Sequence, residues 1–424
     1  MTQEFQVSVT PVGGDEYLIR TERVAPGVPL AEEQVVWAVE DWLVQARQLM
    51  NDPLLTILRG TGGAASAGVL RSQASSSVPL RSGKSTEPPL ANTIFDLVSL
   101  GQCLYGALFQ GTIRDSWVTA QGIAQHRQDL LRLRLGLKGD RLWRLPWEVL
   151  HRGDRPITTG TDVVFSRYQF GQGMVRPVMQ APNLGLKPGQ PLRILMAIAA
   201  PTDQERLDLA REARHLQEEL LASSPAIPSS ADYGASPTTA IQLTILEQPD
   251  REQLTRELEQ GHYQVLHYAG HSNLGASGGD LYLVSGRTGL TETLSGDDLA
   301  GLLVNNGIRL AVFNSCRSAY TTDNADGASE QNLAEALIRH GVPAVLAMAE
   351  RIPDEVALTL TRLFYRNLKQ GYAIDLSLNR TRQGLLSAYG SNQLYWALPI
   401  LYLNPDFDGC LVPPVANQRP YPDV

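Results

Sequence analysis

The segments QVLHYAGH (residues 264–271) and LAVFNSC (residues 310–316) are two short apolar runs, and each ends in a reactive side chain. Runs of this kind, bounded by turn-forming residues, predict buried β-strands. In an open α/β sheet, reactive groups gather at the carboxyl ends of the strands. If the two strands are neighbours, the imidazole of His271 and the thiol of Cys316 face each other across a crevice. This arrangement suits a cysteine nucleophile, because the thiolate attacks while the imidazole moves protons.

Each of these residues also has an ordinary structural interpretation. A lone Cys in an apolar run is usually a small core hydrophobe, and a lone His is more often a hydrogen-bonded structural residue. The two together carry more weight, because each ends a predicted strand and each is followed by small or polar residues.

The composition is that of an ordinary globular protein, with 424 residues, 43% of them hydrophobic and 19% charged. This length is enough for two to three domains of about 150 residues each. A net charge of −8 does not support a basic face, so no nucleic-acid partner is expected. No apolar run approaches the ~18 residues of a membrane span, and the start, MTQEF (residues 1–5), lacks the features of a signal peptide. We therefore expect a cytoplasmic protein with no membrane partner.

The cysteines support the same location. Cys103, Cys316 and Cys410 are widely spaced and odd in number, which argues against a disulfide framework or a Cys-based zinc site and favours a reducing compartment. No ligand cluster is visible, so no metal and no cofactor are expected. A reducing compartment also preserves a nucleophilic thiol.

Residues 1–128 predict an α+β region. Alternating apolar residues around Gly13-Gly14-Asp15 predict a hairpin over 4–23. Helical spacing of apolar residues predicts helices over 32–50 and 91–110. Between these helices, residues 60–89 are rich in Gly, Ala and Ser and predict a mobile loop.

The loop contains GKST (residues 83–86), which resembles part of a phosphate-binding loop. The upstream glycine that such a loop requires is replaced by Val78, and no strand precedes it, so this interpretation is rejected. Arg71, Arg81 and Lys84 in the same loop are sites that a protease of basic specificity could cut, this protein included.

Residues 129–190 predict the start of a second unit. LRLRL (131–135) alternates and predicts a half-exposed strand, and the two tryptophans around the proline of LWRLPWEVL (142–150) predict a packed corner. The Gly/Pro-rich stretch 168–191 predicts a domain boundary.

Residues 191–405 alternate strand and helix in the βαβ manner that predicts a mostly parallel sheet flanked by helices. Residues 281–291 predict a small hairpin, Ser295 predicts a helix cap, and the Pro-rich end, 406–424, predicts a surface tail. The predicted strands are 192–199, 241–246, 264–271, 310–316, 344–348 and 396–403. The predicted helices are 203–222, 251–260, 295–304, 332–339, 354–369 and 373–388.

Several motifs resemble the CHAT domain, a bacterial branch of the caspase-like cysteine peptidases that is related to separase. The resemblance covers roughly residues 130–405. One departure is Ser272, where the family commonly has glycine after the histidine. The motifs are LPWEVL (145–150), HYAGH (267–271), NSCRS (314–318), FYRNLKQG (364–371) and WALPILY (396–402).

The resemblance implies a caspase-like α/β fold with strand order 2-1-3-4, on which the N-terminal α+β region packs. It implies that His271 is the general base, that Cys316 is the nucleophile, and that the His271 and Cys316 strands are adjacent. The oxyanion would be bound by the backbone N–H groups of Ser272 and Cys316, and His267 would be a buried structural residue. No third residue that orients the imidazole is evident, so a Cys/His dyad is predicted.

Relatives of this kind cleave after either basic or acidic residues, and a basic preference needs a buried carboxylate in the substrate pocket. The candidates near the carboxyl edge are Asp203, Asp323 and Glu350, with Asp326 and Asp354 also close in sequence. We expect cleavage of a protein or peptide substrate after a basic residue. We also expect a latent state, which an activating protein partner could relieve.

Three other classes of function are alternatives to a peptidase. A regulatory or scaffold protein could keep the fold without turnover, although the intact His271/Cys316 pair argues against it. A nucleotide-binding α/β protein is disfavoured because no glycine-rich loop follows strand 192–199. A thiol hydrolase of small amides or esters stays open, since one dyad can serve several acyl transfers.

Overall fold

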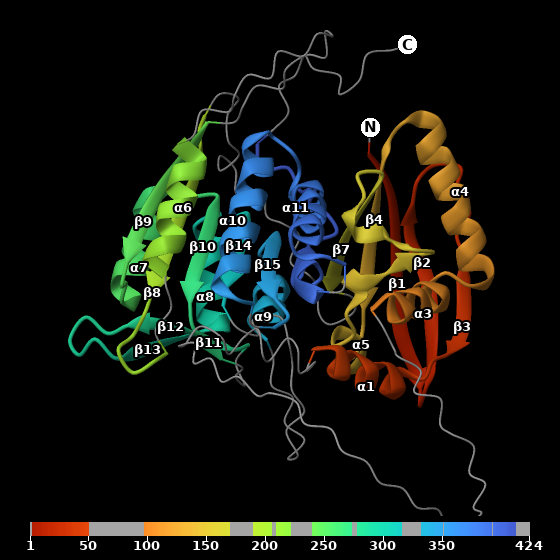
Figure 1. Ribbon diagram of the computed structural model, residues 1–424, viewed down its shortest axis with the longest axis horizontal. Helices are drawn as coiled ribbons and strands as arrows, with labels where there is room; N and C mark the ends of the chain where they lie inside the picture. The colour runs from red at the N-terminus through yellow and green to blue at the C-terminus, as the bar shows by residue number, and fades with distance from the viewer. Residues whose placement is uncertain are drawn as a thin grey trace, which may run out of the picture.

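The computed structural model describes residues 2–50, 97–169, 190–205, 209–221, 240–273, 278–315, 332–350, 352–391 and 393–412. One 11-stranded sheet runs through both halves of the chain, from β9 at one end to β3 at the other (Figure 1). The predicted loop 60–89 and the end of the predicted tail, from residue 413, lie outside the described residues. None of the helices in the described part is long and apolar enough to cross a membrane.

The C-terminal half contains a run of five parallel strands. Its order is β9-β8-β10-β14-β15, followed by the antiparallel strand β16. The predicted order 2-1-3-4 is therefore confirmed, with β9, β8, β10 and β14 as its four members. These strands are β8 (Leu192–Ala199), β9 (Ile241–Glu247), β10 (Val265–Gly270), β14 (Leu310–Asn314), β15 (Ala344–Met348) and β16 (Pro399–Leu403).

Helices cover both faces of this part of the sheet because successive side chains of a strand point to opposite faces. In β8, Ile194 and Met196 pack with α6, α10 and α11, while Leu195 and Ala197 belong to the core on the other face. The first layer is α6 (Leu209–Leu221), α10 (Asp354–Lys369) and α11 (Ile374–Tyr389). The second layer is α7 (Arg251–Gly261), α8 (Gly296–Asn305) and α9 (Leu333–Arg339).

A side chain caps the start of each helix in the second layer, which explains why these helices begin where they do. Asp250 forms a reciprocal capping box with Gln253 at the start of α7. Ser295 accepts a hydrogen bond from the Asp298 amide, as predicted, and Asn332 accepts one from the Glu335 amide.

The N-terminal half extends the sheet as β7-β4-β1-β2-β3 and joins the C-terminal half where Tyr402 of β16 pairs with Arg167 of β7. The predicted hairpin is confirmed as β1 (Thr2–Gly13) and β2 (Glu16–Val24). The other strands of this half are β3 (Glu32–Val36), β4 (Leu130–Leu137) and β7 (Val163–Gln169), with the short pair β5 (His151–Arg152) and β6 (Arg155–Pro156). The described helices are α1 (Val39–Met50), α3 (Leu97–Leu108), α4 (Gly111–Arg127) and α5 (Asp140–Trp143).

Two predictions for this half were wrong. Residues 32–36 form the edge strand β3, paired antiparallel with β2, so the predicted helix over 32–50 begins only at Val39. The strand at 131–135 is buried, not half-exposed, because Arg132 and Arg134 find partners inside the protein. Arg132 forms an ion pair with Asp375 of α11, and Arg134 donates to the backbone carbonyls of Asn404 and Phe407.

Candidate active site

The two predicted site strands are neighbours in the sheet. β10 and β14 run parallel and in register from the pair Val265–Leu310 to the pair Ala269–Asn314. His271 therefore follows one strand at the same edge where Ser315 follows the other. The Ser272 hydroxyl donates to the Ser315 hydroxyl across 2.9 Å between oxygens, so the residues next to His271 and Cys316 in sequence are in direct contact. Cys316 itself lies outside the described residues.

A backbone carbonyl orients the His271 imidazole. Its Nε2 lies 2.8 Å from the carbonyl oxygen of Glu205, in the connection between β8 and α6. A carbonyl only accepts hydrogen bonds, so Nε2 carries the hydrogen and Nδ1 is the acceptor nitrogen of the neutral ring. No sequence pattern could predict this contact, because every residue has a backbone carbonyl.

The connection that carries Glu205 is fixed to a neighbouring hairpin formed by β12 (Asp280–Val284) and β13 (Thr291–Ser295). Asp203 Oδ1 accepts hydrogen bonds from the Thr291 amide (2.9 Å) and hydroxyl (2.8 Å). The Thr202 amide donates to the Gly289 carbonyl at 3.0 Å. The hydrogen bonds from Thr291 hold the pKa of the Asp203 carboxyl below its usual value, so it stays ionised at neutral pH.

The turn after β10 is fixed by buried packing. The Tyr268 hydroxyl is fully buried and lies 2.8 Å from the His271 carbonyl oxygen and 2.6 Å from that of Tyr282. Burial raises the pKa of Tyr268, which therefore keeps its hydrogen and donates it. A Cβ at Gly270 would lie 2.7 Å from the Ala199 carbonyl oxygen, so only glycine fits there. The backbone on either side of His271 is therefore set by its neighbours.

The other predicted site residues are placed less directly. His267 is fully buried, as predicted. Asp203 is exposed, and its assignment to the substrate pocket stays a prediction. Glu350 is half-buried just after β15, and Asp354 is exposed at the start of α10. Asp323 and Asp326 lie outside the described residues.

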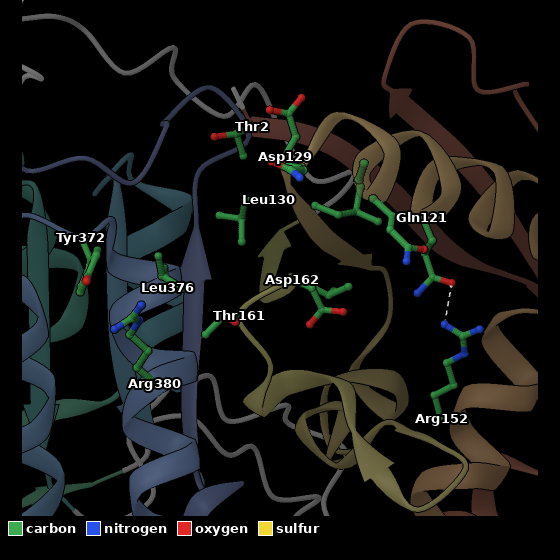
Figure 2. A pocket seen from close by; sticks show the side chains of 15 residues that line it. Thr2, Gln121, Asp129, Leu130, Arg152, Thr161, Asp162, Tyr372, Leu376 and Arg380 are labelled. Carbon is green, nitrogen blue, oxygen red and sulfur yellow. Dashed lines mark hydrogen bonds between the residues drawn. The ribbon is translucent and has the colours of Figure 1, made fainter. Parts of the chain in front are cut away.

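A pocket of about 980 Å³ is found elsewhere, between α4, α11 and the beginnings of β4 and β7 (Figure 2). Thr2 lines it, near the N-terminus at the top of Figure 1, whereas β11 (Ser272–Asn273), which directly follows His271 in sequence, is at the bottom of that view. Its charged residues, Arg152, Arg380, Asp129 and Asp162, are of both signs and spread around the opening. Across the described ranges, no group of three His, Cys, Asp or Glu side chains could hold a metal ion.

The chain is similar to chains in solved structures. A structure of the Saccharomyces cerevisiae separase–securin complex at 2.6 Å resolution contains a chain that is similar at 11% identity, with a TM-score of 0.48, over 94% of this chain and 30% of that one. A second structure of the complex, at 3.0 Å, matches at 13% identity and a TM-score of 0.37, over 68% and 16% of the two chains.

This chain therefore spans less than a third of the chain it matches in the first of these structures. Among curated proteins, no sequence matches it. The model of the CHAT domain matches residues 98–404, which is well over half of the sequence. The protein belongs to the CHAT domain family.

Proposed function

We propose that this protein is a caspase-like cysteine endopeptidase in which Cys316 is the nucleophile and His271 the general base. The observation that carries the proposal is the contact between Ser272 and Ser315, which joins the residue after His271 to the residue before Cys316. The Glu205 carbonyl adds support, because it fixes the imidazole in the tautomer whose Nδ1 can accept a proton.

The proposed reaction has two stages. The His271 imidazole takes the proton of the Cys316 thiol, and the thiolate attacks the scissile carbonyl carbon. The imidazolium then gives this proton to the leaving amine as the C–N bond breaks. His271 then takes a proton from water, which attacks the thioester and releases the acid product and the thiol. The backbone N–H groups of Ser272 and Cys316 would bind the oxyanion in both stages.

Substrate and regulation form the second part of the proposal. We propose cleavage of protein or peptide substrates after a basic residue, with Asp203, Asp323 or Glu350 supplying the carboxylate of the pocket. We also propose that the enzyme is held latent in a reducing cytoplasm, because uncontrolled proteolysis would damage the cell. An activating protein partner would relieve the latency.

Mass spectrometry of the purified protein and of its Cys316→Ala variant, each incubated alone and with a peptide library, tests the proposal. New termini that depend on Cys316 are expected, with Lys or Arg before the cut. Cuts after acidic residues would overturn the basic preference. The absence of any Cys316-dependent cut, with a lysate included as a source of activator, would favour a regulatory or scaffold protein without turnover.

Asp203 could hold the connection that carries Glu205 or line the substrate pocket, and substitutions of Asp203 distinguish these two roles. If it only holds the connection that carries Glu205, Asp203→Asn keeps an acceptor for Thr291 and retains most of the activity. Asp203→Ala would then lower kcat about tenfold by releasing His271. If Asp203 instead lines the substrate pocket, Asp203→Asn removes the charge and raises KM for basic substrates. Profiling both variants on paired basic and neutral peptides distinguishes the two.

The pH dependence of the Asp203–Thr291 contact follows from the lowered pKa of the Asp203 carboxyl. A carboxyl whose pKa is lowered in the folded protein stabilises the fold above the unfolded pKa and loses that contribution as pH falls through the folded pKa. The contact is therefore expected to persist at all pH values above about 4.

A further inference from the structure

A buried carboxylate lies directly beneath the proposed site. Glu212, on α6, is only 4% exposed, and its Oε1 accepts three hydrogen bonds. The donors are Asn314 Nδ2 at 2.7 Å, His267 Nε2 at 3.2 Å and the Thr361 hydroxyl at 3.2 Å. They come from β14, β10 and α10, so a single oxygen atom connects four elements of the fold.

The donors and acceptors of this network follow from the chemistry of its groups. A carboxylate only accepts, so His267 Nε2 carries a hydrogen and His267 Nδ1 accepts one from the Tyr365 hydroxyl, 3.0 Å away. Tyr365 keeps its hydrogen at neutral pH, because burial and the negative charge of Glu212 both raise its pKa. Each of these hydrogen bonds therefore joins one donor to one acceptor.

The network holds the two strands that lead into the site. Asn314 is two residues before Cys316, and His267 is four residues before His271. His267 pairs with Val312 in the sheet, so the side chains of His267 and Asn314 are close neighbours on the face that α6 and α10 cover. Through Glu212, each strand is tied both to the other and to the helices behind it.

Fold stability alone gives little reason for this carboxylate. Removing a charge from water is costly, and well-packed apolar residues often replace buried charged groups with no loss of stability. The carboxylate instead orients its neighbours, because its hydrogen bonds fix the Asn314 amide and the His267 ring in one orientation each. A misplacement of about 1 Å at a reacting group can cost about 100-fold in rate.

We propose that Glu212 is a positioning residue of the peptidase site, which fixes β14 and β10 relative to each other so that Cys316 and His271 meet. This inference rests on the proposed function. Glu212 does not touch substrate, so its loss is expected to lower kcat while leaving KM nearly unchanged.

The test compares Glu212→Gln with Glu219→Gln. Both positions are on α6, but Glu219 pairs with Arg366 near the surface, away from the network. Glu212→Gln is expected to lower kcat about 10- to 100-fold with KM within about twofold, and Glu219→Gln to change neither. A folded Glu212→Gln variant with the kcat of Glu219→Gln overturns the proposal.

Milder variants keep the proposal testable if Glu212→Gln does not fold. Thr361→Val and Tyr365→Phe each remove one hydroxyl from the network with little change of volume. Each is expected to lower kcat severalfold. The effects of Glu212→Gln and Asn314→Ala on kcat are expected to be less than additive in the double variant, because both substitutions affect the same Asn314–Glu212 hydrogen bond. Unchanged kcat in Thr361→Val and Tyr365→Phe overturns the proposal.

Alkylation of Cys316 by iodoacetamide separates this inference from the proposed function, because it requires no substrate. We expect Cys316 to react faster than Cys103 in the wild-type protein, and Glu212→Gln to slow Cys316 without slowing Cys103. If the protein cleaves no peptide but this slowing is seen, the peptidase proposal fails and the positioning role stands. An unchanged Cys316 rate in Glu212→Gln removes the positioning role whatever the peptidase result.

Discussion

Cys316→Ala is expected to abolish peptide cleavage, and His271→Ala to lower kcat/KM by a factor of about 10⁴ or more. Without the thiol no acyl-enzyme forms, and without the imidazole neither the leaving amine nor the attacking water exchanges its proton. The double variant is expected to be no worse than Cys316→Ala, because the two groups act as one unit. Steady-state kinetics on a quenched fluorescent peptide measures all three.

The other two cysteines provide the controls. Cys410 is half-buried, and burial, with Asp408 nearby, raises the pKa of its thiol to about 11. It is therefore protonated and unreactive at neutral pH. Burial also raises the pKa of Cys103. Cys103→Ala and Cys410→Ala are expected to retain full activity, and loss of activity in either one with retention in Cys316→Ala would reassign the nucleophile.

Glu148→Gln is expected to destabilise the fold by about 3 to 5 kcal/mol. Glu148 and Arg167 are each 1% exposed and form a two-point ion pair, in which Arg167 Nε lies 2.9 Å from Glu148 Oε1. Arg382 is also fully buried in this region, where burial lowers its pKa to about 10 and the charge of Glu148 opposes that change. Removing the carboxylate would leave two buried guanidinium groups without their counter-charge.

Urea unfolding followed by tryptophan fluorescence measures this loss. Glu32→Gln is the matched control, because Glu32 pairs with Arg20 at 3.7 Å on the exposed edge of the sheet. An exposed pair contributes no more than about 1 kcal/mol, so the control is expected to unfold close to the wild type. Equal unfolding free energies for the two variants would contradict the account of the buried pair.

Two strands of the C-terminal half could be predicted closely because their sequences are almost entirely apolar. Residues 192–199 and 344–348 have the same bounds in the sequence-based prediction and in the structure. Each is buried on both faces by helices, and such strands have continuous apolar sequences. The helices of the second layer begin at side chains that cap them, which is also a local signal.

Long-range partners explain the errors. Val35, Val36 and Val39 have the spacing of a helix face, but pairing with β2 makes residues 32–36 a strand. Helix α4 was not predicted, although Ile113, Trp117, Ala120 and Ala124 form its buried stripe. Arg132 and Arg134 gave a half-exposed pattern, because their buried partners lie more than 240 residues later in the sequence.

The candidate site shows the same division between local and distant signals. The neighbouring positions of the His271 and Cys316 strands were implied by the family resemblance, which rests on motifs at the ends of those strands. The contacts of Glu205 and Glu212 could not be predicted. Glu205 acts through its backbone carbonyl, and Glu212 is on an amphipathic helix whose sequence gives no sign that this glutamate is buried. His267 could be predicted to be buried, but its partners Glu212 and Tyr365 required the structure.

The Glu205 carbonyl has a consequence for how this site can change during evolution. An acceptor supplied by the main chain survives every substitution at position 205 that keeps the backbone in place. Selection for a well-oriented imidazole would then act on the side chains that hold that backbone, Asp203 and Thr291, and not on the residue that makes the contact. Relatives could differ freely at position 205 and still preserve the same hydrogen bond to His271.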